Sequence, residues 1–197
     1  MLKRVCALFM SMMLMGTTVF ASDMQTENVL DPISFTQREI SYEEAINIVM
    51  GKENASRVEA LNILGPMTRA SGDRIVEKIE EFDFGDGSIV EVGAVYREWS
   101  SGGTFRQLNS LKYAWSALVS SSDTTYDEIY CLDMVEDYPT LNGHVKARGT
   151  VTRTISVSEE ATIGAELELL GFSVGTCTST EMNYRKTANM NLFYHCY

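Results

Sequence analysis

A possible catalytic serine lies near the end of the chain, in the stretch GFSVG at residues 171–175. It fits the G-x-S-x-G pattern, in which a serine nucleophile sits on a sharp turn from a strand into a helix and its acid and histidine partners follow on later strand ends. The residues that follow include His195, but their alternation is that of strands. We therefore expect Ser173 to face solvent while Phe172 and Val174 face the core. A serine hydrolase remains an alternative function only.

Three cysteines lie beyond the N-terminal segment that we expect to be removed: Cys131, Cys177 and Cys196. An odd number leaves at least one thiol free or paired between molecules. The expected register of the C-terminal strands places Cys177 and Cys196 on opposite faces, so a direct disulfide between them needs a bulge. A pairing of Cys131 with either stays open, as does the redox state of all three.

The neighbouring residues His195 and Cys196 do not favour covalent or metal chemistry, because adjacent side chains of a strand point to opposite faces. His144 falls in a predicted turn and lacks ligand spacing to Cys131 or Cys177. No C-x-x-C or H-x-x-x-H pair occurs, whereas a zinc site needs three or four converging ligands. The sequence predicts no metal, no cofactor and no catalytic residue.

Acidic residues gather around a predicted turn. They are Glu77, Glu80, Glu81, Asp83 and Asp86. Asp83 and Asp86 alternate with glycines, but the positions of an EF-hand calcium loop are not filled. We expect a solvated acidic face here.

The N-terminus has the pattern of a secretory signal peptide. Lys3 and Arg4 precede an uncharged apolar run over residues 5–20, and small residues at the end of this run predict cleavage after Ala21. The run is short for a membrane span, which needs about 20 residues. We therefore expect the protein to be secreted or held at the cell surface.

The charge of the chain bears on its partners. The formal charge is −11, and removal of Lys3 and Arg4 with the signal peptide makes it −13. A strongly acidic protein is repelled by nucleic acid and by anionic membranes, so we do not expect these as partners. An extracellular polymer or protein fits better, although the sequence gives neither its identity nor the oligomeric state.

Two regions follow the signal peptide of residues 1–21. Residues 22–70 carry a capping box at Ser41 and Glu44, which predicts a helix that Gly51 would close. A second helix is expected over about 55–64, with Val58, Leu61 and Leu64 on one side and Gly65 at its end. This region is expected to be a short helical N-terminal extension or a pro-segment, followed by a linker.

Residues 71–197 alternate with a period of two, which predicts an antiparallel β domain. A hairpin is expected with Phe84 opposite Val90 across a loop of three or five residues. The clearest strand runs from Val145 to Val157, with apolar side chains at odd positions. The predicted fold is mainly β: an antiparallel sandwich or a partly closed barrel of hairpins.

Three segments of this region are less well determined. Residues 104–120 fit a helix or a strand, and we favour the strand. Residues 159–170 continue the odd-numbered apolar positions of the strand before them, although a helix ended by Gly171 is the alternative. After Leu169 the apolar frame moves to even positions, which indicates a bulge or a turn. Residues 182–194 are expected to form a last hairpin, with its turn at 185–189.

These patterns favour an exported β-rich protein without a catalytic role, which binds an extracellular polymer or protein or serves as an envelope component. The Ser- and Thr-rich alternating residues 143–184 also resemble the amphipathic hairpins of aerolysin-like pore-forming toxins. In that family one strand face meets lipid and the other a water-filled lumen. The resemblance implies a membrane-active secreted protein as the alternative function.

Overall fold

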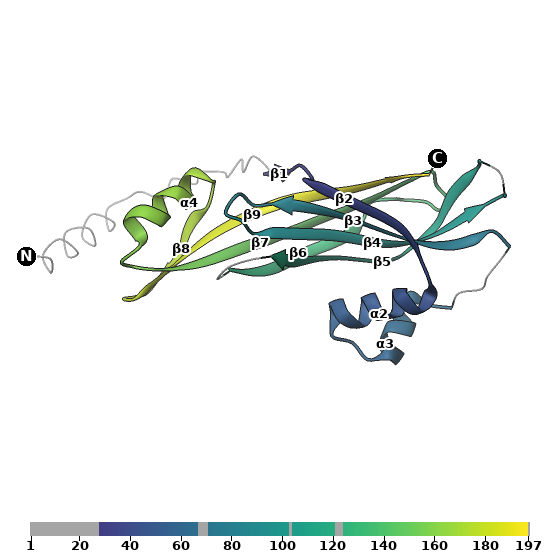
Figure 1. The fold of residues 1–197 in the computed structure, drawn as a ribbon, viewed down its shortest axis with the longest axis horizontal. Helices are drawn as coiled ribbons and strands as arrows, with labels where there is room; N and C mark the ends of the chain where they lie inside the picture. The colour runs from purple at the N-terminus through teal and green to yellow at the C-terminus, as the bar shows by residue number, and fades with distance from the viewer. Residues whose placement is uncertain (1–27, 67–70, 103, 121–123, 197) are drawn as a thin grey trace, which may run out of the picture.

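The computed structural model describes residues 28–66, 71–102, 104–120 and 124–196. Strands predominate among these residues and form two sheets, and the prediction of a mainly β, antiparallel fold is confirmed (Figure 1). The predicted signal peptide lies outside the described residues. Within them, no helix has both the length and the apolar character needed to cross a membrane.

Sheet A has the strand order β1-β9-β7-β6, with β8 also paired to β9. Its strands are β1 (Val29–Leu30), β6 (Thr124–Asp133), β7 (Asn142–Ser156), β8 (Ser173–Cys177) and β9 (Glu181–His195). β7 and β9 pair along their whole length, and only the short β1 runs parallel to its neighbour. The strand predicted from Val145 onward is therefore confirmed. His144, which we expected in a turn, belongs to it.

Sheet B has the order β2-β3-β4-β5, and all its pairs are antiparallel. Its strands are β2 (Ser34–Ile40), β3 (Asp73–Asp83), β4 (Ile89–Ser100) and β5 (Arg106–Ser120). β5 confirms the strand favoured for residues 104–120. The β3–β4 loop has the five residues that we allowed, but Phe82 pairs with Val90. The predicted register, with Phe84 opposite Val90, was wrong by two residues, because Phe84 instead begins the loop with its N–H donated to the Ser88 carbonyl.

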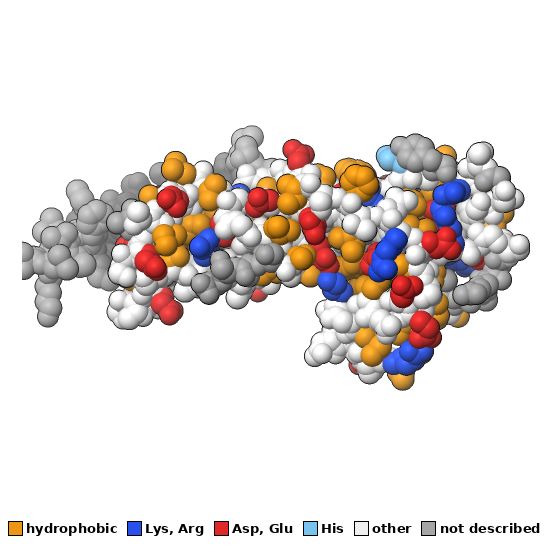
Figure 2. Space-filling model, in the orientation of Figure 1, with side chains coloured by type: hydrophobic (Ala, Val, Ile, Leu, Met, Phe, Trp, Pro, Cys, Tyr) orange, Lys and Arg blue, Asp and Glu red, His pale blue; other side chains and the backbone are white. Residues whose placement is uncertain are grey.

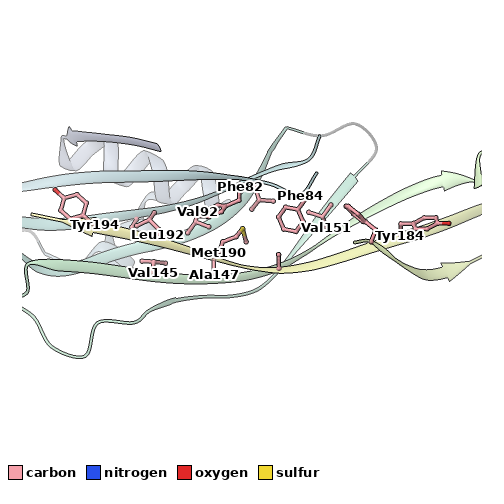
Figure 3. Close-up of a cluster of buried hydrophobic side chains, with 14 of the residues drawn as sticks. Phe82, Phe84, Val92, Val145, Ala147, Val151, Tyr184, Met190, Leu192 and Tyr194 are labelled. Atoms are coloured by element: carbon pink, nitrogen blue, oxygen red, sulfur yellow. The ribbon is translucent and has the colours of Figure 1, made fainter. Parts of the chain in front are cut away.

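The main core lies where the two sheets face one another. Odd-numbered side chains of β7 and even-numbered side chains of β9 meet side chains of β3 and β4, and Figure 3 shows this row of buried groups along the strands. Its fully buried members include Phe82, Val92, Val145, Met190 and Leu192. Burial of apolar surface contributes about 25 cal/mol of stability per Å². This core is therefore the main source of the protein's stability.

Two helices cover the outer face of sheet B, α2 (Tyr42–Glu53) and α3 (Arg57–Leu64). Ala45, Ile46 and Val49 of α2 pack with Tyr113 and Trp115 of β5 in a second buried cluster. The Trp115 ring lies on the backbone of Gly93, where a Cβ would come 2.0 Å from the ring, so only glycine fits there. The indole N–H donates to the Glu91 carboxylate at 2.7 Å.

The separate helical N-terminal extension expected from the sequence is not what the structure shows. Both helices are present, but β2 precedes them and pairs with β3 along all seven of its residues. The reason is the apolar outer face of β4 and β5, which the helices bury. Residues 28–66 thus belong to the same packed unit as the strands that follow.

The helix boundaries are partly as predicted. Both helices start with complete capping boxes, at Ser41 and Ser56. α2 continues through Gly51 to Glu53 and is closed by Asn54 in the left-handed conformation, so the predicted end at Gly51 was wrong. On α3 the expected stripe was also wrong in part. Ala60 and Leu64 are buried there, whereas Val58 and Leu61 are exposed.

Residues 157–180, which we call the tip segment, connect β7 to β9. They contain the short π-helix η2 (Glu160–Gly164), α4 (Ala165–Leu169) and β8. The strand favoured for residues 159–170 was therefore wrong, and the alternative, a helix ended near Gly171, is the one observed. The frame change after Leu169 marks the turn out of α4, where Gly171 has a φ of 86°.

The predicted hairpin at residues 182–194 is a single strand, β9. Its polar middle resembles a turn in sequence, but Lys186 reaches across to sheet B and donates to the Phe84 carbonyl at 2.6 Å. Asn189 is buried, and its N–H donates to the Asn28 carbonyl. Tertiary partners thus keep this polar run extended.

Candidate functional site

The outer face of sheet A is the side of the sheet that points away from sheet B. Pairing along β6, β7 and β9 sets its side chains in rows across the three strands. Three successive rows are Leu132–Lys146–Asn191, Tyr130–Arg148–Asn189 and Asp127–Thr150–Thr187. Among the described residues, no helix covers these rows, whereas α2 and α3 cover the outer face of sheet B (Figure 1).

Aromatic rings and amides lie together at the end of this face near the C-terminus. The His144 ring stacks on Phe193 with ring centroids 4.4 Å apart, and its Nε2 lies 3.1 Å from the Asn191 amide oxygen. The Tyr130 hydroxyl donates to the Asn189 amide oxygen at 3.2 Å. Because β7 separates β6 from β9, Tyr130 spans β7 to make this bond. The side chains are therefore held in place by one another.

Hydroxyl groups continue the face toward the tip segment. The hydroxyls of Thr150 and Thr187 lie 2.7 Å apart, and Thr154 donates to the Asn183 amide oxygen at 2.7 Å. Two buried polar atoms, Arg148 Nε and Thr152 Oγ1, have no hydrogen-bond partner among the described residues. Buried polar atoms are normally hydrogen-bonded, so these two are exceptions to the usual pattern.

The local charge of this face differs from that of the chain. Lys146 and Arg148 occupy the central strand of the three rows, and Asp127 is the one carboxylate in them. The whole chain has a formal charge of −11. The face therefore offers cations, amides, hydroxyls and rings for contact in an otherwise acidic molecule.

A polar pocket of about 260 Å³ opens at one end of this face, between the edge of β9 and β2. Phe193 and His195 of β9 and Phe35 of β2 are among its lining residues. Arg106 and the fully buried Glu98 also line it. We call this the edge pocket.

Glu98 organises the edge pocket. It is fully buried and accepts hydrogen bonds from Arg74 Nε at 2.9 Å and from the Tyr194 hydroxyl at 2.6 Å. Arg106 Nε lies 3.9 Å from the same carboxylate. Burial, with the nearby Glu98, raises the pKa of the Tyr194 phenol and raises the pKa of the Cys196 thiol to about 12. The thiol is therefore protonated at neutral pH and is a poor nucleophile.

The structure does not bring Ser173 and His195 together. Ser173 pairs with Arg185 on β9, ten positions from His195, which corresponds to about 33 Å along a strand. The serine lies after a helix and at the start of a strand, the reverse of a nucleophile elbow. Phe172 is buried as predicted, whereas Val174 is exposed at the sheet edge.

All three predicted cysteines are free thiols in the structure, and none forms a disulfide. Cys131 is half-buried, and burial raises the pKa of its thiol to about 12. Cys177 is exposed on β8. Among the described residues, no three His, Cys, Asp or Glu side chains are grouped so that they could hold a metal.

The predicted solvated acidic face was wrong for several of its members. Glu77 and Glu80 are buried, because β2 lies beside β3 and the side chains of Arg38 and Lys78 bind them at 2.6 and 2.8 Å. Asp86 lies 3.7 Å from Arg153. At the end of the molecule that carries α2 and α3, Figure 2 shows Lys and Arg side chains beside Asp and Glu side chains.

Sequence analysis missed Glu98, Tyr130 and the rows of the outer face. The alternating polar residues of β7 indicated a wet face, but the neighbours of each residue depend on pairing with β9, some 40 positions later. Comparisons with protein-family models, with curated proteins and with solved structures find no match to this chain.

Proposed function

We propose that this protein is an exported β-sandwich without a catalytic role, which binds an extracellular polysaccharide on the outer face of sheet A. In this proposal residues 1–21 direct export and are removed. The observation that carries it is the set of mutually bonded rings, amides and hydroxyls in the rows of the outer face.

The chemistry of these rows suits a sugar chain. Sugars present hydroxyl groups around the ring and apolar C–H surfaces on its two sides. Amides both donate and accept hydrogen bonds, hydroxyls do the same, and aromatic rings supply apolar contact area. Because the Asn189 amide already holds Tyr130 and the His144 ring already stacks on Phe193, binding would cost little side-chain entropy.

The geometry suits an extended polymer better than a small molecule. β7 and β9 are each 15 residues long, which corresponds to about 50 Å of strand. The rows are repeated along this length, so several sugar units can make similar contacts at once. Contacts that are weak individually then add up over a chain.

Affinity electrophoresis of the processed protein tests this proposal. Gels containing dextran, a neutral polysaccharide, or polygalacturonate, an acidic one, are compared with gels without polymer, and binding to purified peptidoglycan is measured by sedimentation. We expect retardation or sedimentation with at least one of them. We expect Tyr130→Ala and Phe193→Ala each to weaken binding about tenfold, or about 1.4 kcal/mol.

Phe105→Ala is the matched control. Phe105 and Phe193 have the same exposed fraction, 51%, but Phe105 precedes β5 in sheet B. It should bind like the unaltered protein. Absence of binding to all three polymers, or equal binding by all variants, would contradict the proposal.

A further inference from the structure

The interior between the two sheets becomes polar at the edge pocket. Even-numbered side chains of β4 point into the main core, and this series runs through Val92, Ala94 and Tyr96. The next member is Glu98, a fully buried carboxylate that lines the edge pocket. Burial of a charge is costly, and a sequence that departs from an apolar core at one place is expected to do so at a functional site. Glu98 therefore marks this pocket as a candidate binding site.

Hydrogen bonds hold the polar side chains of the edge pocket in place. The Tyr194 hydroxyl donates to Glu98 at 2.6 Å and accepts from the Gln37 amide at 3.3 Å. Lys78 of β3 donates to the Phe193 carbonyl of β9 and so joins the two sheets at the pocket. The positions of these groups are therefore set before a ligand arrives, which lowers the entropic cost of binding.

The cations at the edge pocket differ in how closely they are paired. Arg74 binds Glu98 at 2.9 Å, and Lys78 binds Glu80 at 2.8 Å. Arg106 Nε lies 3.9 Å from Glu98, which is too far for a hydrogen bond, and its side chain is 39% exposed. A guanidinium binds a carboxylate through two parallel N–H donors. Arg106 is thus the most loosely paired of these three cations and the one that can bind a carboxylate of a ligand.

The size and the side chains of the edge pocket suit one sugar residue. Pockets for drug-sized ligands begin at about 300 Å³, so a volume of about 260 Å³ suits a single ring. Phe35 and Phe193 are 73% and 51% exposed, and their rings offer apolar contact to the C–H faces of a sugar. The Gln37 amide can bond sugar hydroxyls. A sugar residue that also carries a carboxylate for Arg106 is a uronic acid.

The edge pocket adjoins the outer face of sheet A at Phe193. This ring lines the pocket and also stacks on His144, which is part of the outer face. A sugar chain that lies along the rows of the outer face would therefore reach the pocket with one of its residues. The pocket and the rows can thus act on the same polymer.

We propose that the edge pocket binds one uronic acid residue of this polymer, with the carboxylate of the sugar on Arg106. The inference rests on the proposed function and adds to it that the polysaccharide is acidic. The formal charge of −11 does not prevent such binding, because salt at physiological ionic strength screens charges that are more than about 8 Å apart. Arg106 acts on the bound carboxylate at closer range.

Trigalacturonate and its methyl ester test the proposal, because the ester keeps the sugar rings and removes the negative charges. Binding of each to the processed full chain is measured by isothermal titration calorimetry. We expect the ester to bind at least tenfold more weakly than the acid. We expect Arg106→Gln to weaken binding of the acid about tenfold and to leave binding of the ester unchanged, because only the acid forms charge-assisted hydrogen bonds with the guanidinium.

Arg57→Gln is the matched control. Arg57 on α3 has a side chain that is 52% exposed and binds Glu43 at 2.8 Å, so its replacement removes the same charge from another part of the fold. This variant should bind the acid like the unaltered protein. Circular dichroism verifies that both variants are folded, and the comparison of acid and ester on the unaltered protein does not depend on either variant.

Three results would overturn the inference: equal binding of acid and ester by the unaltered protein, no loss of acid binding in Arg106→Gln, or an equal loss in Arg57→Gln. Failure of the proposed function gives a different result. A neutral polymer that binds through Tyr130, without preference for the acid, would support the proposed function and contradict the inference. Binding of the acid that depends on Arg106 but not on Tyr130 would support the edge pocket and contradict the proposed function.

Discussion

Two helical covers lie on opposite parts of this molecule and differ in how their sequence specifies them. α2 and α3 cover the outer face of sheet B, and η2 and α4 cover the inner side of sheet A near Met182 and Tyr184 (Figure 1). The first pair has capping boxes at Ser41 and Ser56. The second has the alternating pattern of a strand and no side-chain caps. Local sequence thus specifies the helices α2 and α3, whereas tertiary packing specifies the helical form of η2 and α4.

This difference predicts that one cover unfolds only together with the domain, whereas the other can open separately. Where local preference and tertiary packing agree, an element unfolds with the whole domain, and where they conflict it opens more easily on its own. The cover formed by α2 and α3 should therefore behave as part of the core, and the tip segment as a separate opening unit.

The largest expected effect comes from paired core truncations. Ile46→Ala and Leu167→Ala each shorten a side chain that is no more than 2% exposed. We expect Ile46→Ala to lower the free energy of unfolding by about 3 kcal/mol, as for other large-to-small core changes. Leu167→Ala should lower it by about 1 kcal/mol or less, since the tip segment opens before the domain unfolds. Urea titration followed by circular dichroism measures both, and equal losses would contradict the comparison.

A smaller effect is expected at the helix starts. The Ser41 hydroxyl accepts a hydrogen bond from the Glu44 N–H at 3.1 Å, so Ser41→Ala should lower the free energy of unfolding by about 1 kcal/mol. Ser158 precedes η2 without capping it, and Ser158→Ala should change this quantity by less than about 0.5 kcal/mol. The same urea titrations give the values. A loss at Ser158 as large as that at Ser41 would show that the tip segment also depends on its cap.

The smallest effect is a change in titration. Hydrogen bonds from Ser41 and Ser56 hold the pKa values of Glu44 and Glu59 below their ordinary 4.5, so these bonds stabilise the helices at neutral pH and are lost as the pH falls through the lowered pKa. For Glu44 the main cause is the Ser41 backbone N–H, and for Glu59 it is the Ser56 side chain. Carboxyl NMR titration should show a larger rise for Glu59 in Ser56→Ala than for Glu44 in Ser41→Ala. The reverse order would refute this assignment of causes.

Much of the fold follows from local sequence. A capping box located α2, the spacing of apolar residues before Gly65 located α3, and the alternation from Val145 onward located β7, because these signals depend only on neighbouring residues. The strand at 104–120 was also predicted. What failed was decided by distant partners. Lys186 keeps β9 extended through its bond to the Phe84 carbonyl, and Leu167 folds into a helix because it meets an uncovered patch.

The candidate site was less predictable than the fold. Sequence analysis identified the polar side of β7 but could not place Asn191 beside Lys146, since their pairing depends on the β7–β9 register. Glu98 resembled a surface carboxylate in sequence. Its burial became evident only when Arg74 and Tyr194 were seen to enclose it. The rows and the edge pocket are therefore products of strand pairing.

Because its ring packs against Gly93, Trp115 can serve as an intrinsic fluorescence probe of the α2–α3 cover. The chain has two tryptophans, and Trp115 is enclosed between β4 and α2 while Trp99 is only partly buried. In a Trp99→Phe protein, the fluorescence of the remaining indole would shift to longer wavelength when α2 and α3 lift away. Opening of the tip segment, which packs on β9 of sheet A, would leave the emission wavelength unchanged. A shift to longer wavelength would thus report movement of the α2–α3 cover and not of the tip segment.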